Sequence, residues 1–385
     1  MISQHMKELN AGNSLIRAMF EEGKRLTALH GAENVFDFSL GNPSVSPPNA
    51  VKQAVLEIMQ DPTHGYMNNS GYPHVRESIA QSINRLHNTA FSDQNIVMTV
   101  GAAGALNIVL KSILDPGDEV IVFAPFFGEY RHYVNNFNGK LVVAATNKET
   151  FQPEISALEA ALSERTKAVI INSPNNPSGV IYPESTIQAL TDLLRQQKQT
   201  IYLISDEPYR ELVYDNNTVP YITHYYPHSF VAYSFSKALS LPGERIGYLA
   251  VPSEMDSFED VINALNVANR IMGYVNAPSL FQLVAGRCVD AKVELDEYEK
   301  NRNVLYEHLL ALGFSVTKPQ GAFYMFPRSL IADDVAFCEK AKEYNLLLVP
   351  GSAFGSPGFF RLAFCVGHES VQRSLLYFEK LARSF

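Results

Sequence analysis

Short apolar runs rich in β-branched residues recur along the first two thirds of the chain. They predict six strands, at Ile96–Val100, Glu119–Phe123, Lys167–Asn172, Thr200–Ser205, Phe230–Ser234 and Ile246–Val251. Several are largely apolar, which is typical of strands buried on both faces of a sheet. Segments between them have helical periodicity, at Ala102–Leu114, Pro153–Ser163 and Pro183–Gln197. This alternation predicts an α/β fold with a mostly parallel sheet and helices on both of its faces.

The pattern changes after about residue 275. A long helical stretch is expected over Ala277–Leu312. Short strands near Phe314–Thr317, Ala322–Phe326, Leu346–Val349 and Phe359–Phe364 then mix with helices near Asp333–Glu343 and Glu369–Arg383. The N-terminal part holds an amphipathic helix (Ser14–Leu29) and an extended stretch that ends at Pro43, with no core of its own. We therefore expect a large domain over 46–275 and a smaller α+β domain made of 1–45 plus 276–385.

Length and composition fit this two-domain interpretation. The chain has 385 residues, and a single domain holds on the order of 150. Hydrophobic residues make up 46% and charged residues 18%, as in a packed globular enzyme rather than a disordered chain. The net charge is −9, from 31 basic and 40 acidic residues, and no basic run stands out. Nucleic acid is thus not an expected partner.

The three cysteines, Cys288, Cys338 and Cys365, lie far apart and lack the spacing of metal ligands. They indicate reduced thiols in a cytoplasmic protein without a metal site. The first ten residues lack the apolar segment of a signal peptide. No apolar run reaches the roughly 18 residues of a membrane span, so no membrane association is expected.

Polar and glycine residues follow five of the predicted strands. In open parallel α/β sheets, ligands bind at the carboxyl ends of the strands. The residues that follow the strands, in chain order, are Gly101 to Gly104, Phe127, Asn176, Asp206 with Tyr209, and Ser236 with Lys237. Chance would scatter such residues over both ends of the sheet, so we expect them to meet in one site.

The stretch SFSKALSLPGER, residues 234–245, is the most informative of these. The Lys237 amine can form a Schiff base with an aldehyde cofactor. The hydroxyls of Ser234 and Ser236 and the Arg245 guanidinium are suitable ligands for a phosphate dianion. A lone lysine is usually a solvated surface charge. Together with the other strand ends, however, this stretch indicates a site for pyridoxal 5'-phosphate (PLP).

The glycine-rich turn and Phe127 have possible roles at such a site, each beside a simpler alternative. Backbone N–H groups at Gly101 to Gly104 can bind phosphate at a helix N-terminus, although an ordinary strand-to-helix turn is the alternative. Phe127 offers a flat face for a pyridine ring, although a lone Phe is usually a core residue.

Asp206, Asn176 and Tyr209 could contact the pyridine ring. Asp206 can pair with the pyridinium nitrogen and keep the ring protonated, where the alternative is a helix cap. Asn176 and Tyr209 could hydrogen-bond the ring O3' oxygen. Their alternatives are a turn residue and a half-buried tyrosine with its hydroxyl in water.

Over nearly its whole length the chain resembles fold-type I PLP enzymes, in particular the aspartate-aminotransferase-like members of the class I/II aminotransferases. Their motifs recur here in order, as HGYMNNSGYPHVRESIA, SPNNPSG, SDEPYREL, SFSKALSLPGERIG, PQGAFYMFP, PGSAFG and GFFRLAF. Two positions depart from the pattern. Many relatives carry a hydroxyl residue where Ala103 stands, and many carry Trp or Tyr where Phe127 stands.

The resemblance implies a role for each matched residue. Lys237 is the implied cofactor anchor, and Arg361 the implied clamp for the substrate α-carboxylate, assisted by the backbone N–H of Gly41. Tyr66 would reach the cofactor phosphate of a neighbouring subunit, which implies a homodimer with shared sites. The remaining implied cofactor ligands are Gly101, Ala102, Ala103, Phe127, Asn176, Asp206, Tyr209, Ser234, Ser236 and Arg245. Asn176 is implied to contact the substrate as well. A surface ion pair is the weaker alternative for Arg361.

These residues predict a PLP-dependent aminotransferase that moves an α-amino group between an L-amino acid and a 2-oxo acid. Lys237 would act as the general base for the substrate Cα proton. Free lysine has a pKa of ~10.4, so this pKa must be lowered for the task. A cationic cofactor and Arg245 nearby would act in that direction.

The preferred substrate side chain is left open. Arg270 lies where dicarboxylate-specific relatives may place an arginine that reaches across a dimer, which would favour aspartate or glutamate. An arginine at a helix end is equally often only a partner of the helix dipole. Ile16, Tyr274 and Tyr324 could instead form an apolar or aromatic pocket.

Other functions remain open at this stage, because a fold does not determine the reaction. A C–S β-lyase, an aminocyclopropane-carboxylate-synthase-like lyase or a decarboxylase would share most of these residues. A PLP-sensing regulator is disfavoured because no helix-turn-helix extension is present. A protein that has lost its activity is disfavoured because all of the anchor residues are kept.

Overall fold

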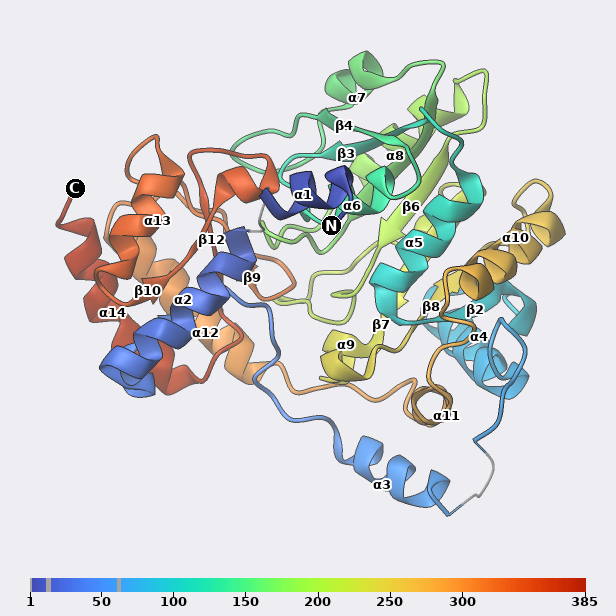
Figure 1. The fold of residues 1–385 in the computed structure, drawn as a ribbon, viewed down its shortest axis with the longest axis horizontal. Coiled ribbons are helices and arrows are strands. Elements are labelled where there is room, and N and C mark those ends of the chain that lie inside the picture. Colours follow the sequence, from blue (N-terminus) through green and yellow to red (C-terminus); the bar gives the residue numbers. More distant parts are fainter. Residues whose placement is uncertain (1, 12–14, 61–63) are drawn as a thin grey trace.

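The computed structural model describes residues 2–11, 15–60 and 64–385, without the side chains at 5, 8, 10, 11, 15–18 and 20. Figure 1 shows a large central sheet with its helices beside a smaller body that contains both the N-terminal helix α2 and the C-terminal helices. None of the helices in this described part is both long and apolar enough to cross a membrane.

The central sheet has seven strands in the order β2-β8-β7-β6-β5-β3-β4. All neighbours pair in parallel except β8, which runs antiparallel to both β2 and β7. The predicted mostly parallel sheet is thus confirmed. Its strands are β2 (Ile96–Thr99), β3 (Glu119–Phe123), β4 (Lys140–Ala144), β5 (Thr166–Asn172), β6 (Tyr202–Asp206), β7 (Ser229–Ser234) and β8 (Gly247–Ala250).

Helices cover both faces of this sheet, because alternate strand residues are apolar on each side. Val120 and Val122 belong to one buried cluster, whereas Ile121 and Phe123 belong to another. Helices α5 (Gly101–Ile113), α6 (Tyr130–Asn135) and α10 (Phe258–Ile271) contribute to the first cluster, and α3 (Asn49–Ile58), α4 (Pro73–His87), α7 (Ile155–Ala161), α8 (Glu184–Arg195), α9 (Phe235–Ala238) and α11 (Ser279–Arg287) to the second.

The smaller body has its own buried cluster, which includes Phe38, Leu305, Phe337 and Phe378. Strand β1 (Phe36–Asp37) pairs in parallel with β10, so the N-terminal segment joins this body. Its other elements are α2 (Leu15–His30), α12 (Asp296–Ala311), β9 (Tyr324–Met325), α13 (Asp334–Lys342), β10 (Leu346–Leu347), β11 (Val349–Pro350), β12 (Phe360–Ala363) and α14 (His368–Ala382). Helix α1 (Gln4–Ala11) precedes α2 in the chain. The residue boundaries between two domains stay a prediction.

Two sequence-based expectations are wrong. The stretch Ala277–Leu312 is not one helix but two, α11 and α12, because the chain between them leaves the helix and Val293 N–H bonds to the Ala238 carbonyl of α9. Residues 314–317 form no strand in the described structure. Phe314 instead packs its ring against Phe337 and Phe360.

Candidate active site

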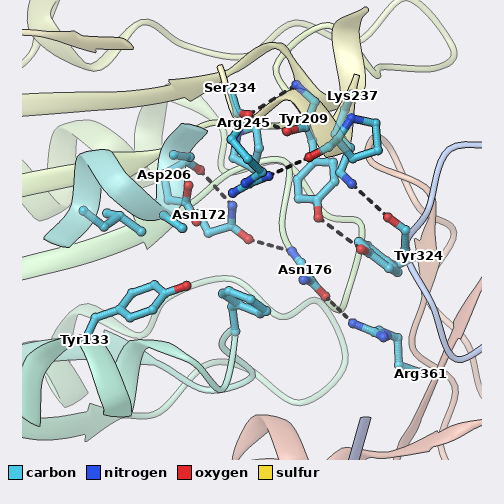
Figure 2. Close-up of a pocket in the computed structure, with 18 residues that line it drawn as sticks. Tyr133, Asn172, Asn176, Asp206, Tyr209, Ser234, Lys237, Arg245, Tyr324 and Arg361 are labelled. Carbon is cyan, nitrogen blue, oxygen red and sulfur yellow. Dashed lines mark hydrogen bonds between the residues drawn. The ribbon is translucent and has the colours of Figure 1, made fainter. Parts of the chain in front are cut away.

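A cavity of about 280 Å³ lies at the carboxyl edge of the central sheet, between the two bodies (Figure 2). The ends of β5, β6 and β7 and the N-terminus of α5 form one wall, and residues of β9, β12 and the segment after β1 form the other. Its lining residues are Gly41, Ala102, Ala103, Leu106, Phe127, Tyr133, Asn172, Asn176, Asp206, Pro208, Tyr209, Ser234, Ser236, Lys237, Pro242, Arg245, Tyr324 and Arg361.

Most of the predicted site residues therefore meet in one place. Gly101 lies at its edge, where an added Cβ would approach an Arg245 guanidinium nitrogen to 3.1 Å. Tyr66 and Arg270 do not line the cavity. Tyr66 is 95% exposed and lines a separate depression with Tyr274, and Arg270 lies exposed in the last turn of α10. The Ile16 side chain is outside the described part of the chain.

Lys237 follows directly from the end of β7, in the short helix α9. Its amine donates a hydrogen bond of 2.8 Å to the Gly41 carbonyl and lies 5.4 Å from the centre of the Phe323 ring. Burial of the amine, with help from the nearby Arg245 and Arg361 guanidinium groups, lowers the pKa of Lys237 to about 8. The lysine is thus partly neutral near pH 8 before any ligand binds.

Asp206 is the last residue of β6 and is buried. Its Oδ2 accepts a hydrogen bond of 2.5 Å from the Tyr130 hydroxyl. Its Oδ1 is buried and has no partner within the described residues. Burial raises the pKa of Asp206 to about 7, with a further rise from Glu207 and an opposing effect of the Tyr130 hydrogen bond. A free buried carboxylate oxygen is costly unless a donor joins it, so Oδ1 fits a cationic N–H group.

Asn172 connects this aspartate to the loop that carries Asn176. The Asn172 side chain donates to the Asp206 carbonyl at 2.8 Å and accepts from the Asn176 backbone N–H at 2.7 Å. Asn176 is itself buried, and its side-chain oxygen accepts from Arg361 at 3.1 Å. Asn176 therefore does more than form a turn.

Arg361 lies on β12 and is only 2% exposed, which excludes a surface ion pair. Its guanidinium also donates to the Ser39 carbonyl at 2.5 Å and stacks near the rings of Tyr324 and Phe354. Its Nε is buried without a partner in the described structure. Such a held, planar cation is suited to a carboxylate.

Tyr209 and Tyr324 join across the cavity wall, with their hydroxyl oxygens 3.0 Å apart. Both are buried, so the Tyr209 hydroxyl does not end in bulk water. Tyr324 also lies so close to Gly41 that no side chain fits there, because a Cβ on Gly41 would lie 1.8 Å from the Tyr324 hydroxyl oxygen.

The remaining end of the cavity gathers donors that suit an anion. The Ser234 and Ser236 hydroxyls lie 2.7 Å apart. Arg245 adds a guanidinium, and the first residues of α5, including Ala102 and Ala103, add the N-terminus of a 13-residue helix. Unpaired N–H groups at such a terminus attract phosphate.

The sequence-based prediction missed Asn172 and Tyr133, which line the cavity, and Tyr130, which contacts Asp206 from behind the cavity wall. Asn172 could have been suggested by its place as the last residue of β5, immediately before the SPNNPSG loop. Tyr130 and Tyr133 lie in helix α6, beyond the strand end that Phe127 marks, and one helical turn apart. Their sequence carries no signal that distinguishes them from ordinary core tyrosines.

Comparison with known proteins agrees with this geometry. The family model described as "Aminotransferase class I and II" matches residues 33–376. An aspartate aminotransferase from Thermotoga maritima is 32% identical, with 97% of each chain covered. An aspartate/prephenate aminotransferase from Thermus thermophilus is 30% identical over 89% of each chain.

A solved structure of an amino transferase from Eubacterium rectale is 43% identical and superposes with a TM-score of 0.97, covering 100% of this chain and 99% of the other. These relatives do not favour a lyase, a decarboxylase or a regulator. The chain belongs to the class I and II aminotransferases, and it is a PLP-dependent transaminase with the fold-type I architecture.

Proposed function

We propose that the cavity is the PLP site of this aminotransferase and that Lys237 is both the cofactor anchor and the proton carrier. One observation carries the proposal. A lysine with a lowered pKa, a buried carboxylate oxygen without a partner and a buried arginine line the same small cavity. Perturbed groups in a cleft are typical of functional sites.

The donor set fits PLP. Arg245, Ser234, Ser236 and the α5 N-terminus suit its phosphate, and Gly101 leaves space there that a Cβ would fill. The free Oδ1 of Asp206 suits a pyridinium N–H. Phe127 would support the ring, and Asn176 and Tyr209 would donate to its O3' oxygen. When bound, PLP supplies an aldehyde that accepts amino groups and a ring that accepts electrons released at the substrate Cα.

Lys237, Arg361 and Asp206 would each have a separate role in the reaction. Lys237 would take the proton from the substrate Cα with its neutral amine, for which a pKa of about 8 is suitable. Arg361 would hold the α-carboxylate in a bidentate contact, and the Gly41 N–H would add a donor. Asp206, once ionised, would keep a proton on the ring nitrogen.

For the substrates, we propose an L-amino acid donor, with aspartate or glutamate as the first candidates, and a 2-oxo acid acceptor. The names of the relatives support this choice, since several are aspartate or aspartate/prephenate aminotransferases. Arg270 lies outside the cavity of its own chain, so it could bind a side-chain carboxylate only in the site of a second subunit.

We also propose a cytoplasmic homodimer. Large apolar side chains are exposed near Tyr66 and on α10, with Val267 at 47%, Ile271 at 57% and Val275 at 37% exposure. The Tyr66 and Val275 segments are tied together by bonds from Asn69 to the Val275 carbonyl and from Asn276 to the Asn68 carbonyl. Such a surface favours burial against another copy. The three cysteines are free and buried, as in a reducing compartment.

A panel of amino donors with one 2-oxo acid tests the substrate proposal. We expect transfer from aspartate and glutamate, and a selective loss of both in Arg270→Ala, with alanine and phenylalanine unaffected. Unchanged relative rates for aspartate in the variant would remove Arg270 from the proposal. Pyruvate and ammonia formed without added 2-oxo acid would instead indicate a β-lyase.

A further inference from the structure

Tyr130 is the first residue of α6 and is 1% exposed. Its ring packs edge-on against Phe127, with ring centres 5.6 Å apart and planes at 87°. Its hydroxyl donates the 2.5 Å hydrogen bond to Asp206 Oδ2. The Tyr130 side chain does not line the cavity, so it cannot touch a ligand there directly.

This contact makes the Asp206 carboxylate asymmetric. Oδ2 is held by Tyr130, whereas Oδ1 is buried and has no hydrogen-bond partner in the part of the chain that the structure describes. The Asp206 backbone carbonyl is held separately by Asn172 at 2.8 Å. Because the Asp206 backbone carbonyl is held by Asn172 and Oδ2 is held by Tyr130, the direction in which Oδ1 points is fixed.

The hydroxyl can act only as a donor towards this carboxylate. Burial, together with the negative charge of Asp206, raises the pKa of Tyr130 well above its ordinary value. The proton therefore stays on the phenol oxygen across the working pH range. A donor to a charged acceptor in a buried site gives a strong, directional contact.

The same turn that carries Tyr130 also carries Phe127. The Tyr130 N–H donates to the Phe127 carbonyl at 3.1 Å, which closes the turn between the two residues. The residue proposed to support the face of the cofactor ring and the residue that holds Asp206 thus belong to one short turn that this hydrogen bond closes.

We propose that Tyr130 is a positioning residue that holds Asp206 so that its free oxygen faces the cofactor nitrogen, and that the 127–130 turn sets ring stacking and ring protonation together. This inference rests on the proposed role of Asp206. Tyr130 acts through Asp206 and touches neither substrate nor cofactor. Its function in the reaction is to keep the carboxylate ionised and correctly aimed.

The test compares Tyr130→Phe with Tyr182→Phe in the full-length holoenzyme. Both substitutions remove one hydroxyl from a fully buried tyrosine that does not line the cavity. Of these two hydroxyls, it is the one of Tyr130 that bonds to Asp206. Tyr130→Phe keeps the ring and its contact with Phe127. We expect it to weaken PLP binding to the apoenzyme on the order of tenfold, as for loss of a hydrogen bond to a charged group, whereas Tyr182→Phe leaves this affinity unchanged.

The spectrum of bound PLP and the kinetic constants distinguish a positioning role of Tyr130 from an effect on the stability of the fold alone. Tyr130→Phe should alter the absorbance of bound PLP and move its spectroscopic pH midpoint, because ring protonation depends on Asp206. It should also lower kcat with little change in KM. Normal spectra and PLP affinity, with only a lower melting temperature, would overturn the inference.

Asp206→Asn distinguishes failure of this inference from failure of the proposed site. If Asp206→Asn is severe and Tyr130→Phe adds nothing to it in the double variant, Tyr130 works through Asp206 as proposed. If Asp206→Asn is severe but the effects multiply independently, the positioning role is wrong and the site is right. If Asp206→Asn leaves PLP binding intact, the proposed function of the cavity itself fails.

Discussion

The Lys237 amine is buried without an ion-pair partner in the described structure, which is unusual for a lysine. The amine is largely buried, yet among the described residues its hydrogen-bond acceptor is a backbone carbonyl and not a carboxylate. A buried ammonium without an ion-pair partner is unfavourable, which is why the neutral form is favoured here. The unfavourable burial of the ammonium form serves the reaction, because the neutral amine is the form that reacts with an aldehyde and accepts a Cα proton.

The reactivity of this amine in the apoenzyme should depend on pH. The pKa of Lys237 is lowered from 10.5 to about 8, so the neutral fraction grows as the pH rises through 8 and is nearly complete well below 10.5. The rate at which added PLP is trapped on Lys237 by borohydride should therefore rise with pH and level off soon above pH 8. Mass spectrometry of the lysine-containing peptide measures it. A rate that still climbs steeply at pH 10 would contradict the lowered pKa.

Gly41 is the second residue whose chemistry follows from its surroundings. A Cβ here would lie 1.8 Å from the Tyr324 hydroxyl oxygen and 2.7 Å from the ring carbon that bears it. Gly41→Ala must therefore displace Tyr324 or the segment whose carbonyl accepts from Lys237. Overpacking of this kind costs about 1–3 kcal/mol, so we expect a lower melting temperature and a higher KM for the amino donor.

Gly243→Ala provides the matched control for Gly41→Ala. Gly243 is a neighbour of the cavity residues Pro242 and Arg245, but a Cβ there meets nothing within 4 Å. This variant should keep its melting temperature and its KM. Equal behaviour of the two variants would show that the close approach at Gly41 has no consequence.

At the level of elements, Asn172 links the ends of two neighbouring strands. It closes β5 and bonds both to the Asp206 carbonyl of β6 and to the Asn176 N–H in the following loop. Asn172→Ala leaves two buried groups without partners, at about 1–3 kcal/mol each. We expect at least tenfold weaker PLP binding together with reduced thermal stability, measured by fluorescence titration and thermal denaturation.

The opposite end of the same strand offers the control. Gln199 bonds to the Ser163 and Thr166 carbonyls where β5 begins, far from the cavity along the strand. Gln199→Ala should reduce stability without changing PLP affinity. If both variants weaken PLP binding equally, the effect of Asn172 would be general loosening of β5 rather than alignment of the site.

The elements that sequence patterns predict well are those with a strong local signal. The buried strands β3, β5 and β7 are continuous apolar runs, and they are close to the predicted ranges. Strand β4 was missed because it is an edge strand whose residues are mostly partly exposed. The strand expected at Phe314–Thr317 has the right composition, but it has no partner strand in the described part of the chain. Strand pairing is a property that the local sequence does not contain.

For the site residues, too, the sequence predicts position in the fold better than contacts that depend on packing. Residues at strand ends, such as Asp206 and Lys237, could be predicted because parallel strands bring their carboxyl ends together. Tyr130 and Tyr324 could not be given their contacts, because these depend on how α6 and β9 pack against the sheet. Arg270 and Tyr66 lie outside the cavity of their own chain, and the local sequence does not contain how a second chain would be placed against them.

The whole molecule presents an incomplete site if Tyr66 is a cofactor ligand. Tyr66 is 95% exposed and lines a depression separate from the cavity that holds Lys237. In a two-fold symmetric dimer, the same surface from each copy meets the other. Each site would then combine Lys237 from one subunit with Tyr66 from its partner, and this division can be tested with mixed dimers.

Lys237→Ala and Tyr66→Ala variants are purified separately, unfolded together in equal amounts and refolded. Random pairing makes half of the dimers mixed, and each mixed dimer has one site with both residues intact and one with neither, so activity should return to about one quarter of the wild-type value. If Tyr66 served its own chain, no site in a mixed dimer would be intact, and mixing would give only the average of the two variants. Sedimentation of the mixture checks that dimers have formed. Recovery well above the average of the parents therefore requires a homodimer in which the partner subunit completes the site.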